Sequence, residues 1–427
     1  MNMNNEERKQ FERNYWALTF EGVCFIGGIS MLSTGGVIAV FIYTMTGSVA
    51  LVGLGVTIQS LALLLGQLVI APYMDSIRNL PGFLFKVMLL RICPFLMALP
   101  LFLGVSPVLA AWIALFFFGL FWFFDGTTAV PWGELVSRTI KPELRGQMMG
   151  TQVALGGGIS LLTGLLLTWL LATPRLTDHH RFAIIFTIGA IILLTALIFI
   201  RMVKDPSPIV SSKKPDIWKY YAGIPTLIRQ HKHLRRAIVA RIPGYIGFST
   251  ITFTVVFGSS VMDISDAQLS WLVYSQIVGT LIGGYVLGKV SRLFGNKPVI
   301  LLCNLGVVVT LGMAITLATF PTLGYIWLIA TCVFASIWFN NWLGYFNYFL
   351  DIAPRDKRPT FQVVGNCIGI PFSFIGYFIG FTIDRWGFVF AFVVGGIAAI
   401  VTMLVTLKLL SRKQINELAN VEIADTV

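Results

Sequence analysis

The chain has 427 residues, of which 56% are hydrophobic and only 12% are charged, and its mean hydropathy is +0.81. A water-soluble core of this size cannot absorb so many apolar side chains, so the composition excludes a soluble globular protein and indicates a polytopic membrane protein. The formal net charge of +12 would suggest a nucleic acid partner in a soluble protein. In a membrane protein the surplus instead sets topology and attracts anionic headgroups, so we expect lipid contacts and no nucleic acid.

Twelve apolar runs are long enough to cross the hydrocarbon, which takes about 20 helical residues. Six precede and six follow a strongly basic stretch, Arg201–Arg241. The expected spans are 15–43, 50–74, 83–104, 107–136, 146–172, 181–202, 237–260, 267–289, 298–318, 322–350, 359–384 and 387–410. We therefore expect an all-α polytopic protein of two pseudo-symmetric six-helix bundles, the layout of secondary transporters.

The basic residues predict the orientation. With both termini cytoplasmic, about 27 of the 31 Lys and Arg face the cytoplasm. The mixed charges before the first run do not resemble a cleaved signal. We expect a multi-pass protein of the cell membrane, and the short loops fit a bacterial plasma membrane.

The expected domains follow from the runs: a bundle at 1–202, a basic linker at 203–236, a second bundle at 237–411 and a cytoplasmic tail at 412–427. Within the linker, apolar residues recur at helical spacing among basic ones, which predicts an amphipathic helix on the inner leaflet. It serves either as a tether between the bundles or as a regulatory binding site.

Three ionisable side chains lie deep within apolar runs: Glu21, Arg91 and Asp125. Each costs at least a few kcal/mol at the middle of a bilayer, so each needs a partner, water or a function. In the functional interpretation, Asp125 or Glu21 binds and releases a proton and so couples proton flow to conformational change. In the structural interpretation, Arg91 and Asp125 form a buried ion pair that only locks two helices together. Arg91 indicates an anionic substrate if it faces the cavity.

Polar side chains in other spans are candidates for a substrate cavity. The richest group is in the run IWFNNWLGYFNYF, where amides can hydrogen-bond a solute and aromatic faces can stack on it. The alternative is that they bond neighbouring helices or lie at the membrane interface. The candidates are Trp338, Asn340, Asn341, Gln59, Tyr245 and Gln276.

The two halves resemble each other at their short junctions. After the second span the chain reads APYMDSIRNLPG (71–82), and after the eighth it reads GKVSRLFGNKPVI (288–300). With the six-plus-six layout, the chain resembles the major facilitator superfamily, whose signature here is a glycine, an acid, a base, a second glycine and further bases. The later copy has Ser291 where the acid is usual, and the earlier copy has Ala71 for the first glycine, so no subfamily is indicated.

The resemblance implies that charged residues near the cytoplasmic helix ends latch the two halves in the outward-facing state. Glu134 and Arg138 also have the spacing of a simple pair on one helix face, and Asp351 with Arg355 or Arg358 is a weaker counterpart. Glycines at fourfold spacing in spans five and eight suit closely packed helices, and the resemblance implies that these spans face each other. The gating candidates are Asp75, Arg78, Glu134, Arg138, Arg145, Arg292 and Lys297.

We therefore expect a secondary active transporter of a small solute that works by alternating access as a monomer, with protons as the coupling ion and the direction of transport open. A transporter-like receptor or scaffold is the alternative. We expect no enzyme, no cofactor and no metal site, because no metal cluster or nucleophile with a base appears at matched depth. G-x-x-x-x-G-K at 283–289 is followed by Val290 instead of Ser or Thr, so it is no phosphate loop.

Overall fold

The structure, a computed structural model, describes residues 5–33, 37–173, 176–205, 216–254, 257–258 and 266–417. Helices make up the regular structure of these ranges, and no strand occurs in them. Parts of the expected linker (206–215), of the seventh span (255–256 and 259–260) and of the tail (418–427) lie outside them. Nine helical segments of the described ranges are long and apolar enough to cross a membrane.

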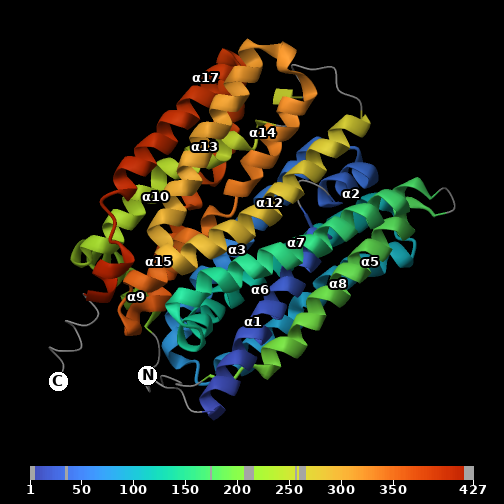
Figure 1. The fold of residues 1–427 in the computed structure, drawn as a ribbon. Coiled ribbons are helices and arrows are strands. Elements are labelled where there is room, and N and C mark those ends of the chain that lie inside the picture. The colour runs from blue at the N-terminus through green and yellow to red at the C-terminus, as the bar shows by residue number, and fades with distance from the viewer. Residues whose placement is uncertain are drawn as a thin grey trace. The chain divides into compact units, whose positions relative to one another are not determined.

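The chain divides into two compact units, the first made of 1–141 and 155–220 and the second of 142–154 and 221–427. One continuous helix, α7, therefore contributes to both. The helices up to the linker are α1 (Asn5–Ser30), α2 (Val37–Thr46), α3 (Val49–Ile70), α4 (Leu80–Met88), α5 (Cys93–Phe102), α6 (Pro107–Thr139), α7 (Pro142–Ala172) and α8 (Asp178–Met202). Those that follow are α9 (Ile217–Gln230), α10 (Lys232–Ile251), α12 (Asp266–Phe294), α13 (Asn296–Thr319), α14 (Gly324–Trp338), α15 (Asn341–Ile352), α16 (Arg358–Cys367) and α17 (Ile375–Thr406) (Figure 1).

Several expected spans are interrupted. The run 15–43 is two helices, α1 and α2, because the helix ends at Ser30 in a turn. The run 83–104 is divided by a 3₁₀ turn, Leu89–Ile92. The eleventh run, 359–384, is divided between α16 and α17 by the 3₁₀ segment Ile370–Phe374, and α17 continues into the twelfth run across a kink at Gly387. The φ of Gly387 is 80°, a left-handed conformation that glycine adopts without a Cβ clash. This bend is at the first residue of the twelfth expected span, directly after the predicted gap at 385–386.

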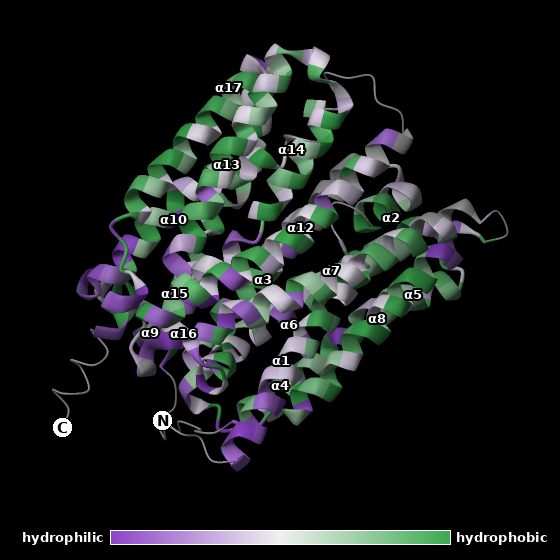
Figure 2. Cartoon of the chain, in the orientation of Figure 1, coloured by the Kyte–Doolittle hydropathy of each residue, from purple (hydrophilic) through white to green (hydrophobic). Residues whose placement is uncertain are grey.

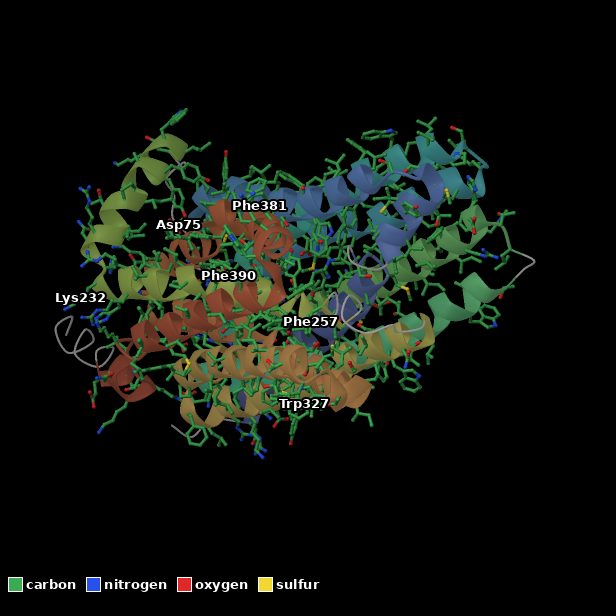
Figure 3. The ribbon with its side chains drawn as sticks, turned by 90° about the horizontal axis from the view of Figure 1, so that it is seen from above. Asp75, Lys232, Phe257, Trp327, Phe381 and Phe390 are labelled. Atoms are coloured by element: carbon green, nitrogen blue, oxygen red, sulfur yellow. The ribbon has the colours of Figure 1, made fainter. Side chains whose placement is uncertain are left out.

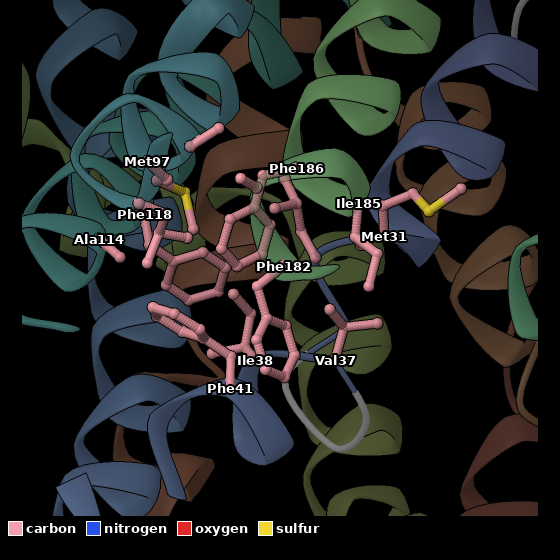
Figure 4. Packing of buried hydrophobic residues seen from close by; sticks show 14 of the residues in the cluster. Met31, Val37, Ile38, Phe41, Met97, Ala114, Phe118, Phe182, Ile185 and Phe186 are labelled. Atoms are coloured by element: carbon pink, nitrogen blue, oxygen red, sulfur yellow. The ribbon is translucent and has the colours of Figure 1, made fainter. Parts of the chain in front are cut away.

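Unit 1 is held by aromatic packing. In it α1 packs on α8, and α3 packs on α6. Phe41 of α2 contacts Phe182 and Phe186 of α8 edge-on, with ring centroids 5.1 Å apart in each pair (Figure 4). All three side chains are fully buried. Because lipid tails are as apolar as these rings, close van der Waals packing holds such helices together.

In unit 2, α10 and α13 pack on α17, and α12 packs on α14. Figure 2 shows hydrophobic residues along α13 and α17, whereas hydrophilic residues gather at α9. Phe381 and Phe390 of α17 remain 54% and 47% exposed, as suits side chains that face lipid (Figure 3). The linker segment contains α9, whose Ile224, Leu227 and Ile228 pack on the core of unit 2.

Candidate functional site

Arg91 lies in the 3₁₀ turn that divides the third expected span. Pro94 follows three residues later, at the start of α5. Proline has no backbone N–H and its ring clashes with the carbonyl four residues earlier, so the helix cannot run through this point undisturbed. The break places the guanidinium group inside unit 1, where Arg91 is only 5% exposed.

Arg91 joins the other two deep ionisable residues. Its Nη1 donates to Glu21 Oε1 of α1 at 2.9 Å, and its Nη2 lies 3.5 Å from Asp125 Oδ1 of α6. The guanidinium carbon is 4.7 Å from the ring centroid of Phe25, within cation–π range. Trp132 donates its indole N–H to Glu21 Oε2 at 2.8 Å. We call Glu21, Arg91, Asp125 and Trp132 the Arg91 cluster.

The formal charges of the Arg91 cluster do not balance. It holds two carboxyl groups and one guanidinium, and within the described ranges no second basic side chain forms an ion pair with either acid. With both acids ionised the cluster carries a net charge of −1, which is costly in a low-dielectric interior. Uptake of one proton by either acid brings the net charge of the cluster to zero. The arrangement can therefore bind a proton or a small cation.

The sequence singled out Glu21, Arg91 and Asp125, and the structure brings all three together. The structural interpretation paired Arg91 with Asp125, but its shorter contact is with Glu21. Sequence reasoning missed Phe25 and Trp132. Phe25 is one helical turn after Glu21 and Trp132 is two turns after Asp125, so helical spacing from the two acids was an available signal.

Two of the polar candidates of unit 2 share a cavity, and the others lie elsewhere. Asn340 is 3% exposed and donates to the backbone carbonyl of Thr280 at 3.1 Å, a helix-to-helix contact. Trp338 packs against Gly306. Asn341 and Tyr245 both line a cavity of about 180 Å³. Gln276 of α12, like Gln59 of α3 in unit 1, is half-buried.

Glu134 and Arg138 pair as their spacing predicted. Arg138 Nε donates to Glu134 Oε1 at 2.8 Å, and its Nη1 donates to Asp205 at 3.1 Å. Arg78 lies near the same end of unit 1, where it lines a 690 Å³ cavity with Arg201. Asp75 is exposed (Figure 3).

Arg145 lies in unit 2 and pairs with Asp351 at 3.2 Å. The other Asp351 oxygen accepts from Asn296 Nδ2 at 2.7 Å, and Asn296 Oδ1 accepts from the Ser291 hydroxyl at 2.6 Å. Ser291 stands where the acid of the signature is usual, and the amide of Asn296 links its hydroxyl to the Asp351 carboxylate. The gating candidates therefore form separate local groups.

Two further gating candidates contact the C-terminal segment. Lys297 Nζ donates to the backbone carbonyls of Leu407 and Leu409, both at 2.8 Å. Arg292 is exposed, and its backbone carbonyl accepts from Arg412 at 2.8 Å.

Glycines bring α7 and α12 into backbone contact within unit 2. A Cβ on Gly150 would overlap the carbonyl oxygen of Gly284, and one on Gly146 would overlap the Ser291 hydroxyl. Spans five and eight are therefore in contact along the residues of α7 that belong to this unit.

Comparison with known proteins identifies similar structures but no similar sequence. No family model and no curated protein matches the chain. The solved proton:xylose symporter XylE, of the major facilitator superfamily, matches with a TM-score of 0.74 and 13% identity over 96% of this chain and 99% of that chain. A bacterial homologue of the iron transporter ferroportin, in an outward-facing state, matches with a TM-score of 0.72 and 12% identity over 92% of this chain and 98% of that chain. The fucose:proton symporter FucP of E. coli matches with a TM-score of 0.70 and 12% identity over 93% of this chain and 98% of that chain.

Proposed function

Because these likenesses show that the chain has the all-α polytopic fold of major facilitator superfamily transporters, we propose that it is a secondary active transporter that moves a small solute by alternating access. In this proposal 1–202 and 237–411 are the two bundles, 203–236 joins them, and 412–427 is the tail. The protein works as a monomer in the cell membrane with both termini in the cytoplasm, as its Lys and Arg distribution favours. The proposal covers uptake and efflux alike.

Proton coupling rests on one observation, the unequal charges of the Arg91 cluster. Two buried carboxyl groups share one guanidinium, so protonation of one acid converts a net charge of −1 into a neutral group. A neutral cluster fits a closed, dry interior, whereas a charged one favours water or a cation. A conformational cycle that opens the cluster to water on alternate sides would therefore carry a proton across.

Asp125 is the acid we assign to proton exchange. Its contact with Arg91 is the longer, 3.5 Å against 2.9 Å for Glu21, and its side chain is 10% exposed against 3%. Glu21 also accepts from Trp132. The carboxylate with more and shorter hydrogen bonds is held more firmly in its charged form. Glu21 thus acts as the permanent partner of Arg91, and Asp125 gains and loses the proton.

The charge groups at the helix ends are proposed to control the cytoplasmic gate. Glu134, Arg138 and Asp205 form one group in unit 1, and Arg145 with Asp351 forms another in unit 2. Opening and closing of the gate would break and re-form ion pairs of this kind, at a few kcal/mol for each buried pair. Asp75, Arg78, Arg292 and Lys297 are assigned to the same gate on the family resemblance alone.

The test is transport by purified protein in proteoliposomes, after a ligand screen by thermal shift has identified a solute. Asp125→Asn should abolish accumulation driven by a pH gradient while leaving solute exchange without a gradient. Asp178→Asn is the matched control, because Asp178 is 47% exposed and, among the described residues, forms its ion pair with the nearby Arg181. If Asp125→Asn and Glu21→Gln both keep gradient-driven accumulation, proton coupling at this cluster is wrong. Solute binding without any flux would instead favour the receptor alternative.

A further inference from the structure

Arg241 is a charged side chain in the middle of α10, and no carboxylate pairs with it in the part of the chain that the structure describes. It differs in this respect from Arg91, which has two carboxylate partners. Arg241 is the fifth residue of the seventh expected span, 237–260, and an ionisable residue inside a membrane span is costly and marks a functional site by default. The sequence analysis counted Arg241 as the last residue of the basic stretch Arg201–Arg241, although it also falls within the seventh expected span, 237–260, and so overlooked it.

The contacts of Arg241 hold one edge of the guanidinium. Nη1 donates to the carbonyl of Gly365 at 2.7 Å and lies 3.4 Å from Asn366 Oδ1. The guanidinium carbon lies 5.2 Å from the ring centroid of Tyr345 and 5.5 Å from that of Tyr245. No hydrogen bond engages Nε or Nη2 within the described ranges. These two N–H groups form the side of the fork that binds a carboxylate with two parallel hydrogen bonds.

This side chain lines the 180 Å³ cavity of unit 2, together with Tyr245, Phe248, Trp342 and Asn341. We call this 180 Å³ cavity the Arg241 cavity. Its volume corresponds to about six water molecules of liquid, enough for a small molecule or one end of a larger one. Asn341 Oδ1 is buried without a hydrogen-bond partner. Aromatic walls, one cation and one unsatisfied amide are the composition of a ligand pocket, not of a helix contact.

We propose that the Arg241 cavity binds a small aromatic carboxylic acid. The carboxylate accepts from Nε and Nη2 of Arg241, which supplies the missing counter-ion. The ring of the acid stacks on the aromatic walls formed by Tyr245 and Trp342. A hydroxyl or amino group on the ligand donates to Asn341 Oδ1. The inference rests on the proposed function only in taking this acid to be the transported solute; binding itself can be measured without transport.

A purely structural role for Arg241 makes a different prediction. Gly365 and Asn366 lie near the end of α16, ahead of the 3₁₀ segment Ile370–Phe374, so the guanidinium could serve only to hold this break. A lysine could still donate one hydrogen bond to the Gly365 carbonyl but lacks the planar fork. Arg241→Lys therefore separates the two roles: a structural role predicts unchanged acid binding, and the proposed role predicts weaker acid binding.

The experiment measures binding to the purified full-length protein by calorimetry and thermal shift. The probes are benzoate, phenylacetate and indole-3-acetate, each compared with its uncharged amide. We expect at least one acid to bind and its amide to bind about 10-fold or more weakly, since charge-assisted pairs are the stronger ones. Arg241→Lys should weaken acid binding by a similar factor, and Trp342→Ala should weaken acid and amide alike. Arg8→Lys, at an exposed position, is the matched control.

Three results would overturn the proposal: no acid binds, acid and amide bind equally, or Arg241→Lys binds the acid as tightly as the unchanged protein. If Arg241→Lys does not fold, Trp342→Ala carries the test, and unchanged acid binding by that variant refutes the proposed cavity. Asp125→Asn separates the two proposals. It should retain acid binding even where it abolishes gradient-driven accumulation, so either proposal can fail while the other stands.

Discussion

Replacement of Arg91 by methionine should destabilise the protein more than any other single change in the Arg91 cluster. At an effective dielectric constant of about 20, the contacts at 2.9 Å and 3.5 Å correspond to gross attractions of ~6 and ~5 kcal/mol. Arg91→Met removes both and leaves two buried acids. Desolvation offsets most of the gross attraction, and loss of a shared partner from a buried ion pair has a net cost of about 3–5 kcal/mol.

Replacement of an acid of the Arg91 cluster should destabilise the protein less than replacement of Arg91. Glu21→Gln removes the shorter ion pair but leaves Arg91 and Asp125 as a neutral pair, and the new amide oxygen can still accept from Trp132. We expect a loss of about 1.5–3 kcal/mol, the range for a hydrogen bond to a charged group. In Arg91→Met combined with Glu21→Gln, one of the two orphaned charges is gone. The double variant should therefore be more stable than the sum of the single effects predicts.

The assay is thermal and chemical unfolding of the purified variants in detergent and in lipid. Arg8→Met is the matched control, because Arg8 forms an exposed pair with Glu12 and should give no measurable change. Equal losses for Arg91→Met and Glu21→Gln, with strictly additive effects in the double variant, would refute the view that one guanidinium serves both acids.

Three further predictions concern packing and backbone, and unfolding of the purified variants measures each. Gly150→Ala should cost about 1–3 kcal/mol of stability because its Cβ would overlap a carbonyl oxygen of α12. Gly158→Ala in the same helix is the control, because a Cβ there has no neighbour within 4 Å. A similar loss of stability in Gly158→Ala would contradict the packing argument. Gly387→Ala should cost about 1–2 kcal/mol because its φ is 80°, whereas Gly396→Ala in open space should stabilise the helix by up to about 1 kcal/mol. Phe186→Ala should cost about 3–5 kcal/mol by leaving a cavity beside the rings of Phe41 and Phe182, and a loss below 1 kcal/mol would mean that the site collapses to fill it.

The membrane architecture could be predicted because its signal is local. Runs of about 20 apolar residues must become helices, since the bilayer offers no water to unpaired backbone groups. The same rule made Glu21, Arg91 and Asp125 conspicuous, because a charge within an apolar run is visible without any knowledge of its neighbours. Arg241 escaped notice for a related reason: it is the last residue of a basic stretch, where one more arginine does not stand out.

Partners were harder to predict than positions. Glu21 and Arg91 are 70 residues apart in the chain, and Arg145 and Asp351 are 206 apart. Hydropathy places a residue along its helix, but it does not state how the helix is rotated or which neighbour it meets. The hydrogen bonds from Ser291 through Asn296 to Asp351 depend on three such rotations, so the missing acid of the signature motif did not reveal them.

The sequence by itself determined that the chain spans a membrane as helices in two related halves, and that three charges lie at depth, because these properties depend only on residue type and spacing. Only the tertiary structure decided that those charges form one unbalanced cluster, that the first turns of α7 belong with unit 2, and that Arg241 lines an aromatic cavity. Each of these depends on which helix faces meet, and that is set by packing across the whole chain.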